Sequence, residues 1–116
     1  SSVVQNQTYS DTRLRLATTV GVAYGTDLDL AMRLMAEAAS SQQRVLADPA
    51  PRALLTLFGD SSIQLELGFW IADPEAGKGG VTSDVNLAVW RAFRDNGIEI
   101  PFPQREVRML NEKTAE

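Results

Sequence analysis

Apolar residues alternate with polar or small residues along residues 13–24. A period of two is typical of a strand with one buried face. Several positions on the apolar face are β-branched, which suits a pleated, half-buried surface. The positions on that face are Leu14, Leu16, Thr18, Val20, Val22 and Tyr24. We therefore predict a strand here with these side chains turned toward a core.

The next segment changes to the period of a helix, which we predict over residues 27–47. Thr26 is a candidate N-cap with Asp29 three residues on, and Asp27 and Asp29 place negative charge in the first turn. The apolar stripe comprises Leu28, Ala31, Met32, Met35, Ala38 and Ala39, extended by Val45 and Leu46. Its alanines favour helix and allow close packing on a sheet. The prolines at 49 and 51 end the helix.

Two further strands are predicted over residues 52–58 and 62–71, joined by a tight turn as a hairpin. In the second of them, Trp70 falls on the otherwise polar face, as either an exposed patch or a contact. A flexible loop over residues 72–80 and a second helix from Thr82 or Ser83 to Asn96 follow. We expect Ser83 as its N-cap and Asn96-Gly97 as its stop. Its broad apolar face comprises Val85, Leu87, Val89, Trp90 and Phe93.

The chain then turns into a stiff apolar arm, because prolines at 101 and 103 fix φ and restrict the residue before each. Residues 106–110 read as one short strand with no later segment to pair with. Two outcomes stay open. The arm folds back on its own domain, or Phe102, Val107 and Met109 are buried against other subunits through the strand's free edge.

The element order is β-α-β-β-α-β, which indicates an α+β fold of the ferredoxin-like sandwich type, with the last strand extending outward. The chain has 116 residues, enough for one domain. Its net charge of −4 argues against nucleic acid as a partner and against a polybasic membrane patch. It contains no cysteine, no histidine and no run of about 18 apolar residues. The start at Ser1 without methionine suggests a piece of a longer protein.

Candidate chemistry is sparse. The Gly77-Lys78-Gly79-Gly80 run before a helix invites a phosphate-loop interpretation, but the P-loop spacing is missing and a loop is favoured. Asp27 and Asp29 are better explained by capping than as paired carboxylates, since they point in different directions on a helix. Without histidine or cysteine, no sequence pattern supplies a serine with a base. We predict no catalytic, cofactor-binding or metal-binding residues, and no enzyme activity.

Two stretches together resemble the small-conductance mechanosensitive channel family. They are Val20-Gly21-Val22-Ala23-Tyr24-Gly25-Thr26-Asp27-Leu28-Asp29 and Gly97-Ile98-Glu99-Ile100-Pro101-Phe102-Pro103-Gln104. The resemblance implies the C-terminal α/β domain of a channel subunit in the bacterial inner membrane, lying on the cytoplasmic side. Seven subunits would enclose a vestibule that filters solutes during osmotic shock. The membrane would be reached only through N-terminal helices outside this chain.

The resemblance also implies a division of the chain. Residues 1–11 would end an upstream β domain or linker, and residues 12–100 would form the ferredoxin-like domain. Residues 101–110 would be the arm and a strand of a seven-membered parallel β-barrel, followed by a disordered tail over 111–116. The implied oligomer interface comprises Pro101, Phe102, Pro103, Gln104, Val107 and Met109. The alternative function is a free-standing ferredoxin-like ligand-binding or regulatory module.

Overall fold

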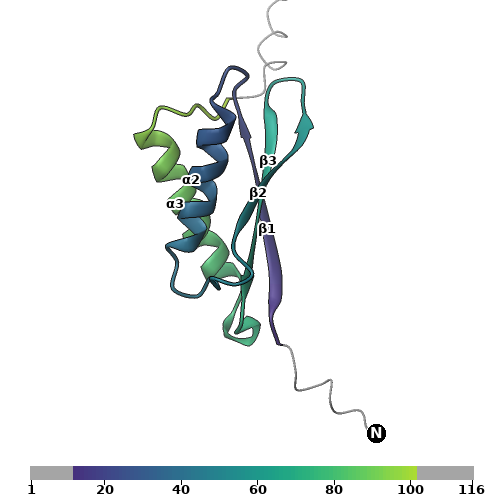
Figure 1. The fold of residues 1–116 in the computed structure, drawn as a ribbon, viewed down its shortest axis with the longest axis vertical. Coiled ribbons are helices and arrows are strands. Elements are labelled where there is room, and N and C mark those ends of the chain that lie inside the picture. Colours follow the sequence, from purple (N-terminus) through teal and green to yellow (C-terminus); the bar gives the residue numbers. More distant parts are fainter. Residues whose placement is uncertain (1–11, 102–116) are drawn as a thin grey trace, which may run out of the picture.

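The computed structural model describes residues 12–101, and Figure 1 shows their arrangement as a helix layer on one face of a small sheet. The elements in chain order are β1 (Leu14–Val22), α2 (Leu28–Ser40), β2 (Arg52–Phe58), β3 (Ile63–Ile71), a short 3₁₀ helix η1 (Pro74–Ala76) and α3 (Gly79–Asp95). The predicted α+β class is confirmed. The predicted fourth strand, residues 106–110, lies outside the described residues.

The sheet has the order β1-β3-β2, and both pairings are antiparallel. β1 pairs with β3 along its whole length, from Leu14 opposite Ile71 to Val22 opposite Ile63. β1 and β2 therefore run in the same direction with β3 between them, which is the split βαβ arrangement of a ferredoxin-like fold. β1 and β2 are the edge strands of this part of the sheet, and each has one edge with no partner strand among residues 12–101.

One apolar core lies between the sheet and the two helices. Its fully buried large side chains include Phe69 and Leu65 from the central strand, Met35 from α2 and Phe93 from α3. Alternation in β3 is clean, with Ile63, Leu65, Leu67, Phe69 and Ile71 all buried. In β1 the predicted apolar face turns inward as far as Val22. Tyr24 is the exception: it is 52% exposed, and its hydroxyl donates to the Gly59 carbonyl oxygen.

α2 is shorter than predicted: it ends at Ser40, whereas the sequence predicted a helix to residue 47. The Ser41 hydroxyl donates to the Ala38 carbonyl oxygen at 2.8 Å, and the chain leaves the helix there. Val45 then forms a bridge with Ile71, and the Leu46 N–H donates to the Trp70 carbonyl oxygen at 2.8 Å. Val45 and Leu46 thus do not extend the helix stripe. They pair with the end of β3, where Val45 is buried.

The N-cap of α2 is Asp27, so the expectation of a Thr26 cap is wrong. The Asp27 carboxylate accepts from the Leu30 N–H at 3.1 Å, in the extended conformation usual for an N-cap. The Thr26 hydroxyl instead donates to the Ala23 carbonyl oxygen at 2.6 Å, closing the turn after β1. Asp29 stays in the first turn of the helix, where its charge suits the dipole.

Removing this cap should destabilise the domain measurably. Asp27→Ala is expected to lower the free energy of unfolding by about 1 kcal/mol, because the Leu30 N–H loses its acceptor. Asp27→Asn keeps a side-chain oxygen and should retain most of that stability. Urea unfolding followed by circular dichroism measures both. Equal losses for the two variants would show that the negative charge matters and the cap does not.

α3 also begins earlier than predicted, at Gly79, and Ser83 is not its N-cap. Val81 is 2% exposed, so burying it draws the first turn of the helix onto the core and outweighs the poor helix propensity of two glycines. The predicted loop over 72–80 is partly ordered by Arg44. Its guanidinium forms a bidentate ion pair with the Asp73 carboxylate at 3.0–3.2 Å. It also donates to the Gly77 carbonyl oxygen at 2.6 Å.

Candidate subunit-assembly surface

The chain leaves α3 through a Schellman motif. Gly97 follows the C-cap Asn96 with φ of +72°, a left-handed conformation that glycine adopts without cost. The Ile98 N–H donates to the Phe93 carbonyl oxygen at 2.9 Å, and the Gly97 N–H to the Arg94 carbonyl oxygen at 3.3 Å. Ile98 packs against the core. The predicted stop at Asn96-Gly97 is confirmed, and this motif sets the direction of the arm.

The start of the arm crosses to the end of β1. The Ala23 N–H donates to the Glu99 carbonyl oxygen at 3.1 Å. In a ferredoxin-like sheet with four strands, the fourth strand would pair with β1 from about this position. Of the predicted interface residues, only Pro101 is described, and it is half-buried beside the β2–β3 turn at Asp60 and Ser61. The other five lie outside the described residues: Phe102, Pro103, Gln104, Val107 and Met109.

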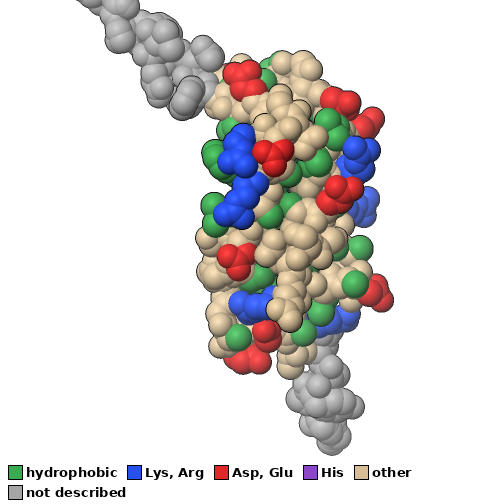
Figure 2. Space-filling view, turned by 90° about the vertical axis from the view of Figure 1, so that its left-hand side faces the viewer, with side chains coloured by type: hydrophobic (Ala, Val, Ile, Leu, Met, Phe, Trp, Pro, Cys, Tyr) green, Lys and Arg blue, Asp and Glu red, His purple; other side chains and the backbone are tan. Residues whose placement is uncertain are grey.

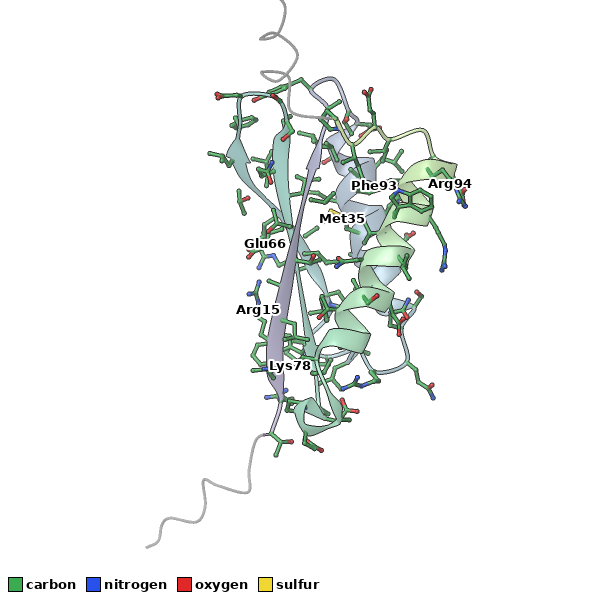
Figure 3. All side chains as sticks on the ribbon, turned by 180° about the vertical axis from the view of Figure 1, so that it is seen from behind. Arg15, Met35, Glu66, Lys78, Phe93 and Arg94 are labelled. Atoms are coloured by element: carbon green, nitrogen blue, oxygen red, sulfur yellow. The ribbon has the colours of Figure 1, made fainter. Side chains whose placement is uncertain are left out.

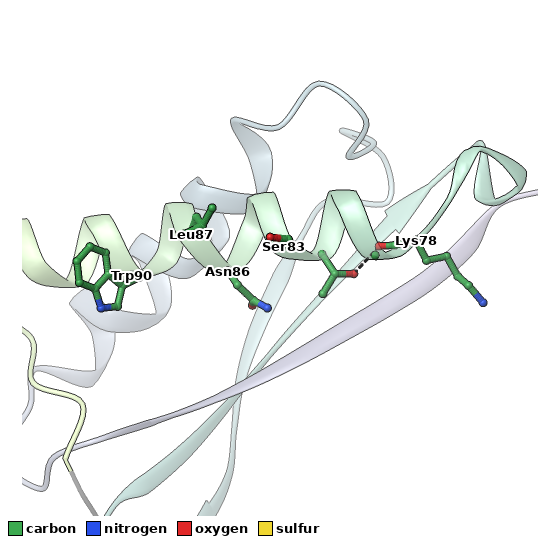
Figure 4. Close-up of a pocket in the computed structure, with 7 residues that line it drawn as sticks. Lys78, Ser83, Asn86, Leu87 and Trp90 are labelled. Atoms are coloured by element: carbon green, nitrogen blue, oxygen red, sulfur yellow. Dashed lines mark hydrogen bonds between the residues drawn. The ribbon is translucent and has the colours of Figure 1, made fainter.

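An apolar groove runs along α3, and Figure 4 shows the residues that line it. We call it the α3 groove and define it by Lys78, Thr82, Ser83, Asn86, Leu87 and Trp90. The Thr18 hydroxyl of β1 donates to the Asn86 side-chain oxygen at 2.8 Å, which ties one wall of the groove to the edge strand. Ile100 lies near Trp90 at the end of the groove.

The groove revises the predicted apolar face of α3. Val85, Val89 and Phe93 are buried as expected, but Leu87 is 45% exposed and Trp90 is 50% exposed. The buried positions follow a four-residue spacing that starts at Val81. That spacing is the signal that could have separated the core face from a second apolar face. The Arg94 guanidinium lies 4.9 Å from the Trp90 ring centre, a cation–π contact.

A second apolar surface lies on β2. We define the β2 patch by Leu54 and Leu57, which are 38% and 58% exposed on the sheet face away from the helices, whereas Phe58, 66% exposed, pairs with the inward-facing Ile63. The pairing with β3 shifts register between Leu55 and Leu57, so one extra residue stands in β2. Without this bulge, Leu57 would share the inward face of Leu55. The bulge turns it outward opposite Gln64, which a strict period of two could not predict.

The sheet face away from the helices is more polar than the face that packs on them. Figure 3 shows Arg15 and Glu66 on this side, away from Met35 and Phe93. The Arg15 guanidinium lies over Gly68, within 2.9 Å of where a Cβ atom would stand. Trp70 is partly buried, and the Arg13 guanidinium lies 5.8 Å from its ring centre. Trp70 therefore makes a contact within the domain, one of the two possibilities that the sequence left open.

Residues 12–101 offer few elements of a chemical site. They contain no buried polar or charged side chain and no group of three potential metal ligands. On the helix side, positive and negative side chains are interspersed (Figure 2), as in the Arg33–Glu37 pair at 3.8 Å. No helix in this range is long and apolar enough to cross a membrane. The distinctive features are thus exposed apolar surfaces and an exit point, not a pocket with convergent polar groups.

Comparison with known proteins decides the family. The model described as "Mechanosensitive ion channel MscS, C-terminal" matches residues 16–100, nearly the whole described range. The chain belongs to the MscS family. The match confirms the resemblance found in the two sequence motifs. It covers every helix and strand among residues 12–101 apart from the first residues of β1.

Individual relatives agree with the family model. The chain is 35% identical over 113 residues to an uncharacterized MscS family protein of Haemophilus influenzae. It is 33% identical over 111 residues to the mechanosensitive channel MscK of Escherichia coli. In these alignments it covers 97% and 96% of its own length but 10% of each relative. The chain therefore spans about a tenth of the length of these two relatives.

Solved structures share the fold of residues 12–101. The closed-state structure of Helicobacter pylori MscS matches with a TM-score of 0.72 and 26% identity, over 78% of this chain and 36% of that one. Arabidopsis thaliana MSL1 matches with a TM-score of 0.64 at 17% identity, over 82% of this chain and 36% of that one. At this lower identity, the second match shows the fold alone.

Proposed function

We propose that this domain is the cytoplasmic vestibule domain of a mechanosensitive channel subunit in a bacterial inner membrane. In this role it holds subunits together and filters the solutes that reach the pore during osmotic shock. The observation that carries the proposal is the family match over residues 16–100. Named channels among the relatives, MscK and H. pylori MscS, support it. These matches favour a channel subunit over a free-standing ligand-binding or regulatory module, and over an enzyme.

We further infer that residues 101–110 carry the assembly contacts, as an arm and one strand of a parallel barrel shared by seven subunits. The exit at Pro101 supports this, because proline cannot donate the N–H that pairing beside β1 would need. A strand with no partner in its own domain gains partners on both edges in a closed barrel. The proposed interface comprises Pro101, Phe102, Pro103, Gln104, Val107 and Met109.

The test uses the full-length subunit purified in detergent. Val107→Asp places a charge at a position that the barrel would bury. Burying an unpaired carboxylate is expensive, so we expect the oligomer to dissociate at lower temperature or lower denaturant. Arg108→Asp is the matched control, since alternation puts residue 108 on the opposite face of the strand. Light scattering during a thermal ramp measures the subunit number.

The two variants separate the outcomes. A seven-subunit particle that is weakened by Val107→Asp and little changed by Arg108→Asp supports the barrel. Equal resistance of both variants contradicts a buried role for Val107. A wild-type subunit that remains monomeric in detergent contradicts the assembly function itself.

A further inference from the structure

The chain leaves α3 through the one Asn-Gly pair in its sequence, Asn96-Gly97. An asparagine before glycine is prone to lose its side-chain amide, because glycine has no side chain to shield the nitrogen that attacks the asparagine side-chain carbon. Asn96 and Gly97 are both exposed, so water reaches the pair. Asn86, the other asparagine among residues 12–101, lies in the middle of α3 and precedes Leu87, whose branched side chain hinders the same attack.

The reaction needs only water. The Gly97 nitrogen bonds to the Asn96 Cγ atom, the bond from Cγ to the amide nitrogen breaks, and ammonia leaves with the proton that the Gly97 nitrogen gives up. Water then opens the resulting succinimide ring at one of its carbonyl carbons. Opening at Cγ gives aspartate, whereas opening at the main-chain carbonyl carbon gives isoaspartate, in which the main chain passes through Cγ.

The folded turn keeps the reacting atoms apart. The ring contains the Asn96 Cα, Cβ and Cγ atoms and the Gly97 nitrogen, so that nitrogen has to rotate to the side of Cβ. Asn96 has ψ of 12°, which places the Gly97 nitrogen beside the Asn96 nitrogen and away from Cβ. The Asn96 side-chain amide also donates to the Ala92 carbonyl oxygen at 2.8 Å, which holds Cγ against the helix. Attack therefore requires the turn to open, with loss of the hydrogen bonds that Gly97 and Ile98 donate.

We propose that Asn96 is a deamidation site that the last turn of α3 keeps unreactive until that turn opens. Helix ends open locally more often than a whole domain unfolds, so the reaction follows the fraying of this turn. The isoaspartyl product adds a methylene group to the main chain at the C-cap, so the Schellman hydrogen bonds cannot re-form in register. Both products add a negative charge beside Asp95 at the C-terminal end of the helix, where the dipole disfavours it. Conversion thus loosens the point at which the chain leaves α3, and the inference does not depend on the proposed channel function.

Ageing the full-length subunit in mildly alkaline buffer tests the site. Trypsin then releases residues 95–105, which contain Asn96, and residues 79–91, which contain Asn86, as separate peptides. Mass spectrometry measures the conversion of amide to acid in each, and fragmentation distinguishes isoaspartate from aspartate. We expect conversion at Asn96 and none detectable at Asn86 over the same period. The excised 95–105 peptide, aged free in the same buffer, should react roughly tenfold faster than the folded site.

Two isoleucine variants test the control by the turn. Ile98 packs against the core and its N–H closes the turn, so Ile98→Ala should open the turn more often and raise the rate at Asn96 roughly fivefold. Ile100→Ala is the matched control and should keep the parent rate, because Ile100 is 41% exposed and lies beyond the hydrogen bonds of the turn. No conversion at Asn96 in the aged subunit would overturn the site. Equal rates in the folded subunit and the free peptide, or equal acceleration by both variants, would overturn the protection by the turn.

Discussion

Replacing Phe69 by alanine is expected to lower the free energy of unfolding of the 116-residue chain by about 3–5 kcal/mol. Phe69 is fully buried in the central strand, opposite Leu16 of β1. Removing its ring loses apolar burial and leaves a cavity that a close-packed core fills only in part. A loss of this size is a large part of the stability of a small domain. Guanidinium unfolding monitored by tryptophan fluorescence measures it.

Leu54→Ala is the control for this prediction. Leu54 lies on neighbouring β2 but is 38% exposed, so the same kind of truncation should change the free energy of unfolding by only about 0.5 kcal/mol. The slope of the transition should be similar in the two variants if both unfold in two states. If the Phe69 and Leu54 variants had equal midpoints, the assignment of Phe69 to the core would be wrong.

Enlarging a buried alanine of α2 should cost about 1–3 kcal/mol. Ala31 and Ala39 are both fully buried, so the helix lies close to its neighbours where these side chains stand. Ala39→Leu adds three carbons where no space is available, and the helix has to shift or the leucine has to adopt a strained rotamer. Thermal unfolding of the variant, compared with the parent chain, measures the loss.

Ser40→Leu provides the comparison at the next residue. Ser40 is exposed, and leucine has the better helix propensity, so this variant should be neutral or slightly more stable. A similar loss for both substitutions would mean that the end of α2 tolerates no leucine for reasons unrelated to packing. No loss in Ala39→Leu would show that the helix is loosely packed.

Local patterns predicted the three strands and two α-helices among residues 12–101, because each has its own hydrophobic period, but they missed the 3₁₀ helix η1. β2 has the predicted bounds, and β3 differs by one residue. The errors at α2 and α3 share one cause: Val45 and Val81 are buried by partners far away in the chain. Such burial moves a helix end by several residues against local propensity. Helix periodicity carries no information about these distant contacts.

The candidate surfaces were harder to predict than the fold. Trp90 and Leu87 are apolar, and apolar residues on a helix are usually assigned to the core. Leu57 is exposed because of a one-residue bulge that no local motif announces. The interface residues suggested by the sequence lie mainly beyond Pro101, so the structure adds a different set of candidates. It finds them where apolar area and a free strand edge coincide.

The position of β3 in the centre of the sheet has a consequence for synthesis. β1 leaves the ribosome first, yet it pairs with a strand completed about fifty residues later. At about 5–20 residues per second, the nascent β1 waits several seconds for its partner. The β2–β3 hairpin, in contrast, is local and can form on its own within microseconds. Newly made chains thus pass through a stage in which an apolar, β-branched strand is unpaired. Wrong pairing with other nascent subunits is most favoured at that stage.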